Sequence, residues 1–155
     1  MYFDLVFNIA FGLSVVGWLA LFARPKNPIV NFWICGTILP VLFAILYTVL
    51  CIFWWNSAPG GFVDRFGSLG GIVTMFNHSR GLLFAGYVHY LAFDLFLGSW
   101  MARRAAVHAV SPLILYPSLF LTLVFGPMGL LLFSLLMNAQ AKWMPENAAA
   151  APRGV

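Results

Sequence analysis

Four long apolar runs separated by polar links dominate the chain. The runs cover about residues 2–22, 30–55, 82–102 and 112–138. Each is close to the ~20 residues that a helix needs to cross about 30 Å of hydrocarbon, since a helix rises about 1.5 Å per residue. The pattern predicts an all-α fold, an integral membrane bundle of four spanning helices. An even number of spans would place both ends of the chain on the same side of the membrane.

Two of the links are short and suit turns between antiparallel helices. Residues 24–28 read Arg-Pro-Lys-Asn-Pro, and the two prolines end one helix and start the next. Residues 103–111 join the third and fourth runs in the same way. We therefore expect one transmembrane domain over residues 1–144. The alanine-rich remainder, 145–155, is predicted to be an exposed, flexible tail.

The middle link, about residues 56–81, is longer and has apolar side chains at helical spacing. Intervals of four and three residues separate the members of this set, which are Phe62, Phe66, Leu69, Val73 and Phe76. A helix with one such face lies in the membrane interface. Three glycines, at 67, 70 and 71, weaken that helix by about 1 kcal/mol each relative to alanine. We expect a short interfacial or re-entrant helix between the second and third spans.

The composition supports a membrane protein and excludes other classes. Hydrophobic residues make up 63% of the chain and charged residues only 8%, whereas soluble domains contain roughly 45–50% apolar residues. The net charge of +4 comes from side chains near the ends of the runs, such as Arg24 and Arg103. This placement suits lipid headgroups rather than nucleic acid. We expect membrane lipids as partners and no nucleic acid.

The start of the chain bears on localisation. The first run begins within the first few residues and no basic segment precedes it, which does not resemble a cleavable signal or an organellar transit peptide. The sequence therefore favours a bacterial inner-membrane protein with several spans. Basic residues lie on both sides of the predicted bundle, so the positive-inside rule only slightly favours both ends facing away from the cytoplasm.

Two ionisable side chains interrupt the third run. Residues 87–98 read Tyr-Val-His-Tyr-Leu-Ala-Phe-Asp-Leu-Phe-Leu-Gly and include His89 and Asp94. Ionisable groups are costly in hydrocarbon and face partners or water. On a helix, Tyr90 lies one turn before Asp94 and is placed to hydrogen-bond it, whereas His89 is about 140° away around the axis. Asp94 is either a structural carboxyl group, protonated or paired with another helix, or a functional acid, base or ligand.

Further polar side chains are candidates for contact with Asp94 or with a ligand. They are Asn8, Asn31, His78 and Arg80. Asn8 is most simply an interhelical hydrogen-bonding group, and Arg80 is more often a headgroup anchor than a site residue. Pro127 lies in the run Gly-Pro-Met-Gly at residues 126–129, where a proline frees a backbone carbonyl and bends the helix. Such a break either allows close packing of helices or lines a ligand cavity.

No recognised metal or cofactor motif is present in the sequence. The histidines and Asp94 are too few and too dispersed to match known metal-ligand spacings. There is no glycine-rich phosphate loop, no serine nucleophile elbow and no cysteine pair, so Cys35 and Cys51 are expected to be buried thiols. We expect no metal, no cofactor, and neither redox nor phosphoryl chemistry.

Two blocks of sequence resemble a known family. They are residues 87–98, quoted above, and residues 121–131, Leu-Thr-Leu-Val-Phe-Gly-Pro-Met-Gly-Leu-Leu. The likeness extends from Phe3 to about Met137, and the family is the group of small four-helix membrane proteins named after an abscisic-acid-deficient plant mutant and associated with neoxanthin synthesis. The resemblance implies isomerisation of a 5,6-epoxy carotenoid to an allenic one, without a redox cofactor.

Such an isomerisation needs a proton donor at the epoxide oxygen and removal of a vinylic proton in a dry cavity. His89, Asp94 and Tyr90 supply groups of these types. The sequence therefore predicts a protein that binds a carotenoid or similar isoprenoid and isomerises it by acid-base chemistry. The alternative is a non-catalytic membrane subunit that binds pigment or lipid or stabilises a larger complex. A homo-oligomer and a membrane complex both stay open.

Overall fold

A computed structural model describes residues 2–143 of the protein. All regular elements in this range are helices. The elements are α1 (Tyr2–Ala23), η1 (Ile29–Ile38), α2 (Leu39–Trp54), η2 (Trp55–Ser57), α3 (Phe62–Phe66), α4 (Leu69–His78), α5 (Arg80–Val107), α6 (Pro112–Phe125) and α7 (Pro127–Trp143). The all-α prediction is confirmed. The predicted tail at 145–155 lies outside the described residues.

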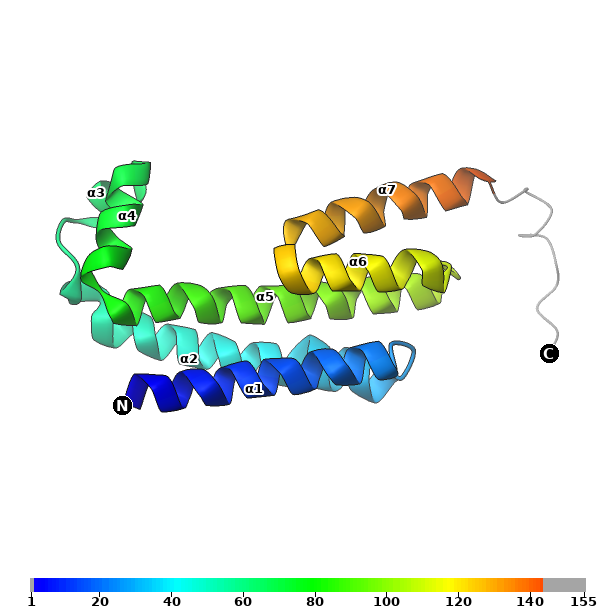
Figure 1. Cartoon of the computed structure of the whole chain (residues 1–155), viewed down its shortest axis with the longest axis horizontal. Helices are drawn as coiled ribbons and strands as arrows, with labels where there is room; N and C mark the ends of the chain where they lie inside the picture. The colour runs from blue at the N-terminus through cyan, green and yellow to red at the C-terminus, as the bar shows by residue number, and fades with distance from the viewer. Residues whose placement is uncertain (1, 144–155) are drawn as a thin grey trace.

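Three long helical segments run side by side and have the length and composition to cross a membrane (Figure 1). They are Phe3–Ala23, Ile29–Ser57 and Arg80–Val107. The third, helix α5, lies at the centre. Within its hydrophobic stretch 56% of the residues are buried inside the protein, against 28% and 17% for the other two segments. Its Val88 and Leu95 are fully buried and form the core with Leu21 of α1 and Phe43 of α2. The protein is therefore a membrane protein with its most protected side chains on α5.

The fourth apolar run is not one spanning helix. It divides at Gly126, which has a φ of +42° that side chains with a Cβ rarely adopt, and Pro127, which has no N–H, starts a new helix. Helix α6 has 14 residues and is therefore about 21 Å long, short of the ~30 Å of hydrocarbon. The prediction of a continuous helix over 112–138 is wrong, and the count of four spanning helices is not confirmed.

Helices α6 and α7 instead form a hairpin whose turn lies beside the middle of α5 (Figure 1). The far end of α7 returns to the α5–α6 link, because the Gln140 side chain accepts a hydrogen bond from the Ser111 amide at 2.9 Å and donates one to the Ala109 carbonyl at 3.1 Å. Small residues let the two helices approach closely, since a Cβ on Gly129 would collide with Thr122 Oγ1.

The two ends of the described chain lie at opposite ends of the bundle (Figure 1). Helix α1 begins at the end where α3 and α4 lie, whereas α7 finishes beside the α5–α6 link. This arrangement differs from the expectation that both ends share one side. The difference follows directly from the break at Gly126, which turns the chain back before it has crossed.

The middle link forms two short helices rather than one. Ser68 separates α3 from α4 and caps α4, since its hydroxyl accepts a hydrogen bond from the Gly71 amide at 3.0 Å. Both helices lie across the long axis of the bundle at one end (Figure 1). The prediction of a single helix is therefore wrong, although the segment is helical on both sides of Gly67. Phe62 and Leu69 of the predicted apolar face are 67% and 78% exposed and remain available to lipid.

Candidate functional site

Asp94 lies in a cavity between α1, α5 and the end of α6. The cavity has a volume of about 380 Å³. Its lining includes Ser14, Trp18, Tyr87, Tyr90, Asp94 and Leu123. Asp94 is only 7% exposed, and its Oδ2 has no hydrogen-bond partner in the described part of the chain. A buried polar atom without a partner is costly in an apolar environment, so it marks the cavity as a candidate ligand site.

Tyr90 is fixed at the edge of this cavity by the break between α6 and α7. Its hydroxyl donates a hydrogen bond to the Leu123 carbonyl at 2.8 Å. In a continuous helix that carbonyl would accept from the amide four residues later, but this position is Pro127, which has no N–H. Tyr90 thus supplies the donor that the proline removes. Tyr90 also lies within interacting distance of the Asp94 carboxyl group, as the sequence predicts, and both side chains line the same cavity.

The glycine at the break packs directly on the Asp94 carboxyl group. A Cβ built on Gly126 would lie 2.6 Å from Asp94 Oδ1, far inside van der Waals contact. Only a glycine both adopts the positive φ and leaves room for the carboxyl group. The two sequence blocks that carry the family resemblance therefore meet at Asp94 and Gly126. Of the two interpretations of the break, close packing is the one that this contact supports, while Leu123 and Val124, just before the break, line the cavity.

His89 is not in the cavity. Its side chain is exposed and stacks on Phe93, with ring centroids 4.4 Å apart, and lies 5.7 Å from the Tyr47 ring of α2. This position matches the angular separation from Asp94 that helical geometry predicts. The structure does not bring His89 and Asp94 together, so a catalytic role for His89 stays a prediction without geometric support.

The residues predicted to bind a ligand lie in separate places. Asn8 is exposed on α1, and His78 ends α4 with its Nδ1 2.8 Å from the Thr74 carbonyl oxygen. Pro127 starts α7 and contributes to the site through the carbonyl that it frees. Asn31 lies at the other end of the bundle and Arg80 in a second cleft. The five residues therefore do not form one site.

Asn31 belongs to a buried polar cluster that joins η1 to α5. The Asn31 side-chain amide donates a hydrogen bond to the Pro25 carbonyl at 2.8 Å. The Asn31 backbone carbonyl accepts hydrogen bonds from Arg103 at 2.8 Å and from the Ser99 hydroxyl. Arg103 also donates to Ser99 Oγ at 2.6 Å. Helix η1 is a wide π-helix, and Gly36 on it has no Cβ that would meet Arg103 and Ser99. The cluster accounts for Asn31 as a structural residue.

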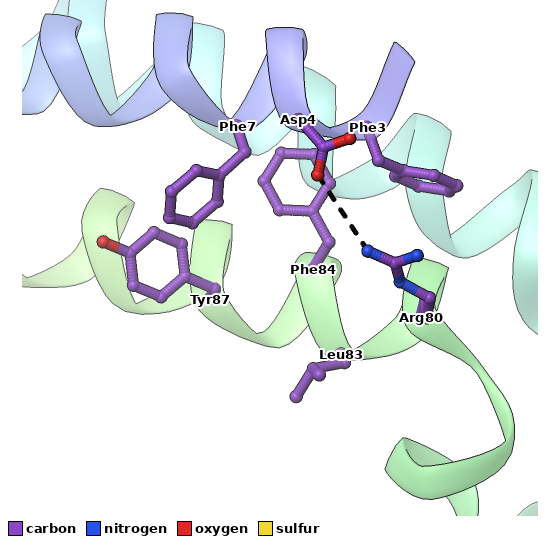
Figure 2. A pocket seen from close by; sticks show the side chains of 7 residues that line it. All are labelled: Phe3, Asp4, Phe7, Arg80, Leu83, Phe84 and Tyr87. Carbon is purple, nitrogen blue, oxygen red and sulfur yellow. Dashed lines mark ion pairs between the residues drawn. The ribbon is translucent and has the colours of Figure 1, made fainter. Parts of the chain in front are cut away.

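Arg80 lies in a cleft at the opposite end of the bundle, between the first turns of α1 and α5 (Figure 2). The cleft has a volume of about 370 Å³. Its lining is Phe3, Asp4, Phe7, Arg80, Leu83, Phe84 and Tyr87. The Arg80 guanidinium is 4.0 Å from the Asp4 carboxylate. Tyr87 lines both this cleft and the Asp94 cavity, so the two are neighbours along α5.

A family model described as ABA DEFICIENT 4-like matches residues 5–133. The chain belongs to the ABA DEFICIENT 4-like family. The match covers α1 through most of the α6–α7 hairpin and includes Asp94, Tyr90 and Gly126. The family confirms the resemblance that the two sequence blocks indicate, and it describes membrane proteins related to neoxanthin synthesis. Searches of curated proteins and of solved structures gave no match.

In this ABA DEFICIENT 4-like protein, α1 provides one wall of the cavity, and the sequence pattern did not predict this contribution. Trp18 is 3% exposed and packs over Gly98, where a Cβ would lie 2.6 Å from its ring. Ser14 lies one turn before Trp18 on α1, is 3% exposed and also lines the cavity. Gly98, which ends the 87–98 block, was the available signal, because a small residue lets another helix approach closely. No group of three or more potential metal ligands occurs among the described residues.

Proposed function

We propose that this protein binds a carotenoid or similar isoprenoid in the Asp94 cavity and isomerises it by proton transfer. The observation that carries the proposal is that Asp94 lines a cavity with aromatic walls while its buried Oδ2 has no hydrogen-bond partner among the described residues. Tyr87, Tyr90 and Trp18 provide flat surfaces suited to a conjugated chain. Membership of a family related to neoxanthin synthesis supports an epoxy carotenoid as the substrate.

The chemistry starts from a neutral carboxyl group. In hydrocarbon an unpaired carboxyl group is favoured in its protonated form, which has an O–H to donate. Asp94 donates this proton to the epoxide oxygen as the ring carbon–oxygen bond breaks and its electron pair goes to oxygen, which leaves a hydroxyl group and a carbocation conjugated with the polyene. Nearby aromatic faces stabilise such a cation.

The second step forms the allene and restores the enzyme. The Asp94 carboxylate removes the proton from the vinylic carbon next to the cation, and the electrons of that carbon–hydrogen bond form the new double bond. Proton and electrons balance, so the net reaction is an isomerisation that consumes no cofactor. One carboxyl group thus serves as acid and then as base. Tyr90 is a positioning residue, because its hydroxyl is held by the Leu123 carbonyl.

The experiment uses a carotenoid-producing bacterial host, since we propose that the protein resides in the inner membrane of a bacterium. The host expresses the wild-type protein, Asp94→Asn, or His89→Ala as a matched control at an exposed ionisable position on the same helix. Pigments are resolved by chromatography and protein amounts are checked by blot. We expect an allenic product with wild type and His89→Ala, and none with Asp94→Asn.

The alternative function, a non-catalytic subunit that binds pigment or lipid, uses the same cavity and predicts a different result. It predicts that the protein copurifies with pigment while no variant changes the pigment profile. An unchanged profile with wild-type protein present, across epoxidised substrates, would overturn the isomerase. Loss of product in His89→Ala but not in Asp94→Asn would overturn the role of Asp94.

A further inference from the structure

Arg103, near the end of α5, is a half-buried cation whose acceptors are uncharged. Its Nη1 atom donates one hydrogen bond to the Asn31 carbonyl at 2.8 Å and another to Ser99 Oγ at 2.6 Å. Among the described residues, no carboxylate forms an ion pair with Arg103. A cation that is withdrawn from water is costly unless an anion compensates its charge. The side chain therefore marks a place where an anionic ligand would be stabilised.

The guanidinium group of Arg103 is held so that one edge keeps its donors. Both N–H groups of Nη1 are used by Asn31 and Ser99, whereas Nε and Nη2 donate no hydrogen bond within the described part of the chain. This orientation depends on Gly36, because a Cβ there would meet Nη1 and would lie 2.6 Å from Ser99 Oγ. The two N–H groups of an Nε–Nη2 edge match two oxygen atoms of a phosphate group.

The link between α1 and η1 brings two more cations to this place. Pro25 in the link is buried, and its carbonyl accepts a hydrogen bond from the Asn31 side chain at 2.8 Å. The link is thus attached to the same residue that holds Arg103. Arg24 and Lys26 lie on either side of Pro25 and are exposed. Their long side chains are therefore available to a ligand bound at Arg103.

The acidic residues that the structure describes lie elsewhere. Asp4 is in the first turn of α1 and Asp64 is on α3, both at the opposite end of the bundle (Figure 1). Asp94 lines the inner cavity. The end with the α1–η1 and α5–α6 links therefore attracts anions. Within the described residues it offers no carboxylate to the ammonium group of a zwitterionic lipid.

Arg103 lies at the depth of lipid phosphate groups. Helix α5 has 28 residues and is about 42 Å long, which exceeds the ~30 Å of hydrocarbon. Only four residues follow Arg103 before the helix ends at Val107, so its guanidinium is at the boundary of the hydrocarbon. The Phe32 ring flanks the guanidinium at 5.6 Å, and the Trp33 ring is 5.2 Å from that of Phe32. Both rings are about half-exposed and give acyl chains an apolar surface that a free phosphate ion would not use.

We propose that Arg103, Arg24 and Lys26 form a binding site for the phosphate group of an anionic phospholipid. The Nε–Nη2 edge of Arg103 donates two hydrogen bonds to phosphate oxygens. The two exposed cations of the link add attraction for the anion and repel the ammonium group of a zwitterionic headgroup. The acyl chains lie along Phe32 and Trp33. The site involves no residue of the Asp94 cavity.

The test measures which lipid gathers beside Trp33. The full-length protein is placed in phosphatidylcholine nanodiscs that contain a fraction of either phosphatidylglycerol or phosphatidylcholine brominated at the same position of the acyl chain. Bromine quenches tryptophan fluorescence on contact, and the difference between the wild type and Trp33→Phe isolates the signal of this site. We expect phosphatidylglycerol to bind there about tenfold more tightly than phosphatidylcholine.

Two charge-conserving substitutions separate the bidentate contact from diffuse attraction. Arg103→Lys keeps the charge but loses the planar fork, and we expect the preference for phosphatidylglycerol to fall from about tenfold to about threefold. Arg104→Lys, at the exposed neighbour, is the matched control and should leave the preference at about tenfold. Thermal unfolding in the same nanodiscs shows whether each variant is folded.

A double substitution covers the case in which Arg103→Lys does not fold. Arg24→Gln combined with Lys26→Gln changes only exposed side chains, so the fold is expected to be retained. Because each cation near the membrane surface adds to the attraction for anionic lipid, the preference should fall to about twofold. An unchanged preference in this variant would show that the α1–η1 link takes no part in binding.

Equal quenching by the two brominated lipids in wild type would overturn the proposal, and so would equal effects of Arg103→Lys and Arg104→Lys. Sodium phosphate, compared with sodium chloride at the same ionic strength, distinguishes a lipid phosphate from a free one. We expect the two salts to act alike. Displacement of brominated phosphatidylglycerol by phosphate but not by chloride would assign the site to a soluble phosphate and contradict the lipid. No arm of the experiment uses pigment, so the outcome is independent of the proposed isomerase.

Discussion

Gly126 packs against the carboxyl group of Asp94, with room for a hydrogen atom but not for a methyl group. A Cβ at Gly126 would lie 2.6 Å from Oδ1. The break in the fourth apolar run and the ionisable residue in the third are thus parts of one arrangement. A turn inside the membrane is tolerated only where protein or a cavity covers its backbone, and the centre of α5 provides that cover.

Gly126→Ala is expected to destabilise the protein by about 1–3 kcal/mol, because the new methyl group meets Asp94 and the positive φ is strained for alanine. Thermal unfolding in detergent, followed by circular dichroism, measures the change. Gly12→Ala is the matched control, since a Cβ at Gly12 meets nothing within 4 Å. A shift in Gly12→Ala as large as that in Gly126→Ala would contradict the close contact.

Asp94→Asn is expected to leave the free energy of unfolding within about 1 kcal/mol of wild type, since Oδ2 has no hydrogen-bond partner in the described residues to lose. A carboxylate in a buried ion pair would instead cost about 3–5 kcal/mol on loss of its charge. Denaturation of the purified variant distinguishes the two cases. A large loss of stability would make Asp94 a structural residue and remove the basis for its role as an acid.

Tyr90→Phe is expected to destabilise the protein by about 1–3 kcal/mol, because the Leu123 carbonyl then has no donor where Pro127 lacks an N–H. The same unfolding assay applies, with turnover in the carotenoid-producing host as a second measurement. Tyr116→Phe, at a tyrosine that is 41% exposed, is the control and should change stability by less than about 0.5 kcal/mol. If both variants behave alike, the Tyr90 hydroxyl does not support the hairpin.

Helical periodicity was sufficient to predict part of the site. It placed Tyr90 on the same face as Asp94 and His89 on another, because both positions are fixed by about 100° per residue along one continuous helix. Periodicity did not predict the cavity wall that Trp18 contributes, because this wall depends on how α1 packs over Gly98. Contacts between helices depend on the shapes of both packed surfaces, whereas the periodicity of a helix indicates only which of its own faces is apolar.

The hydropathy pattern did not predict the break at Gly126, for a different reason. Residues on both sides of the break are apolar, so the run reads as continuous although the backbone reverses. The reversal depends on a single φ and a missing N–H, neither of which changes the hydrophobicity of the segment. The Gly-Pro pair was the visible signal, and its position opposite Asp94 became evident only from the packing.

Arg103→Ala is expected to lower stability by about 2–4 kcal/mol, because it removes charge-assisted hydrogen bonds to Ser99 Oγ and to the Asn31 carbonyl, which then keeps only the Ser99 hydroxyl as a donor. Its neighbour Arg104 is exposed and provides the control. Arg104→Ala should change stability by less than about 0.5 kcal/mol. Equal effects of the two substitutions in thermal unfolding would show that the cluster does not join η1 to α5.

The hairpin also predicts the topology of the protein in its membrane. Single cysteines are introduced at three exposed positions, His78, Ala106 and Ala141, in a background without Cys35 and Cys51. Labelling with a membrane-impermeant thiol reagent before and after permeabilisation gives the side of each.

We expect Ala141→Cys and Ala106→Cys to share one side and His78→Cys to lie on the other, because α7 returns to the α5–α6 link. Most basic residues of the described chain lie at that end, including Arg24, Lys26, Arg103, Arg104 and Lys142. The positive-inside rule therefore places it in the cytoplasm, with the start of α1 on the opposite side. A fourth spanning helix would instead put Ala141→Cys on the side of His78→Cys, and that result would replace the hairpin by a complete crossing.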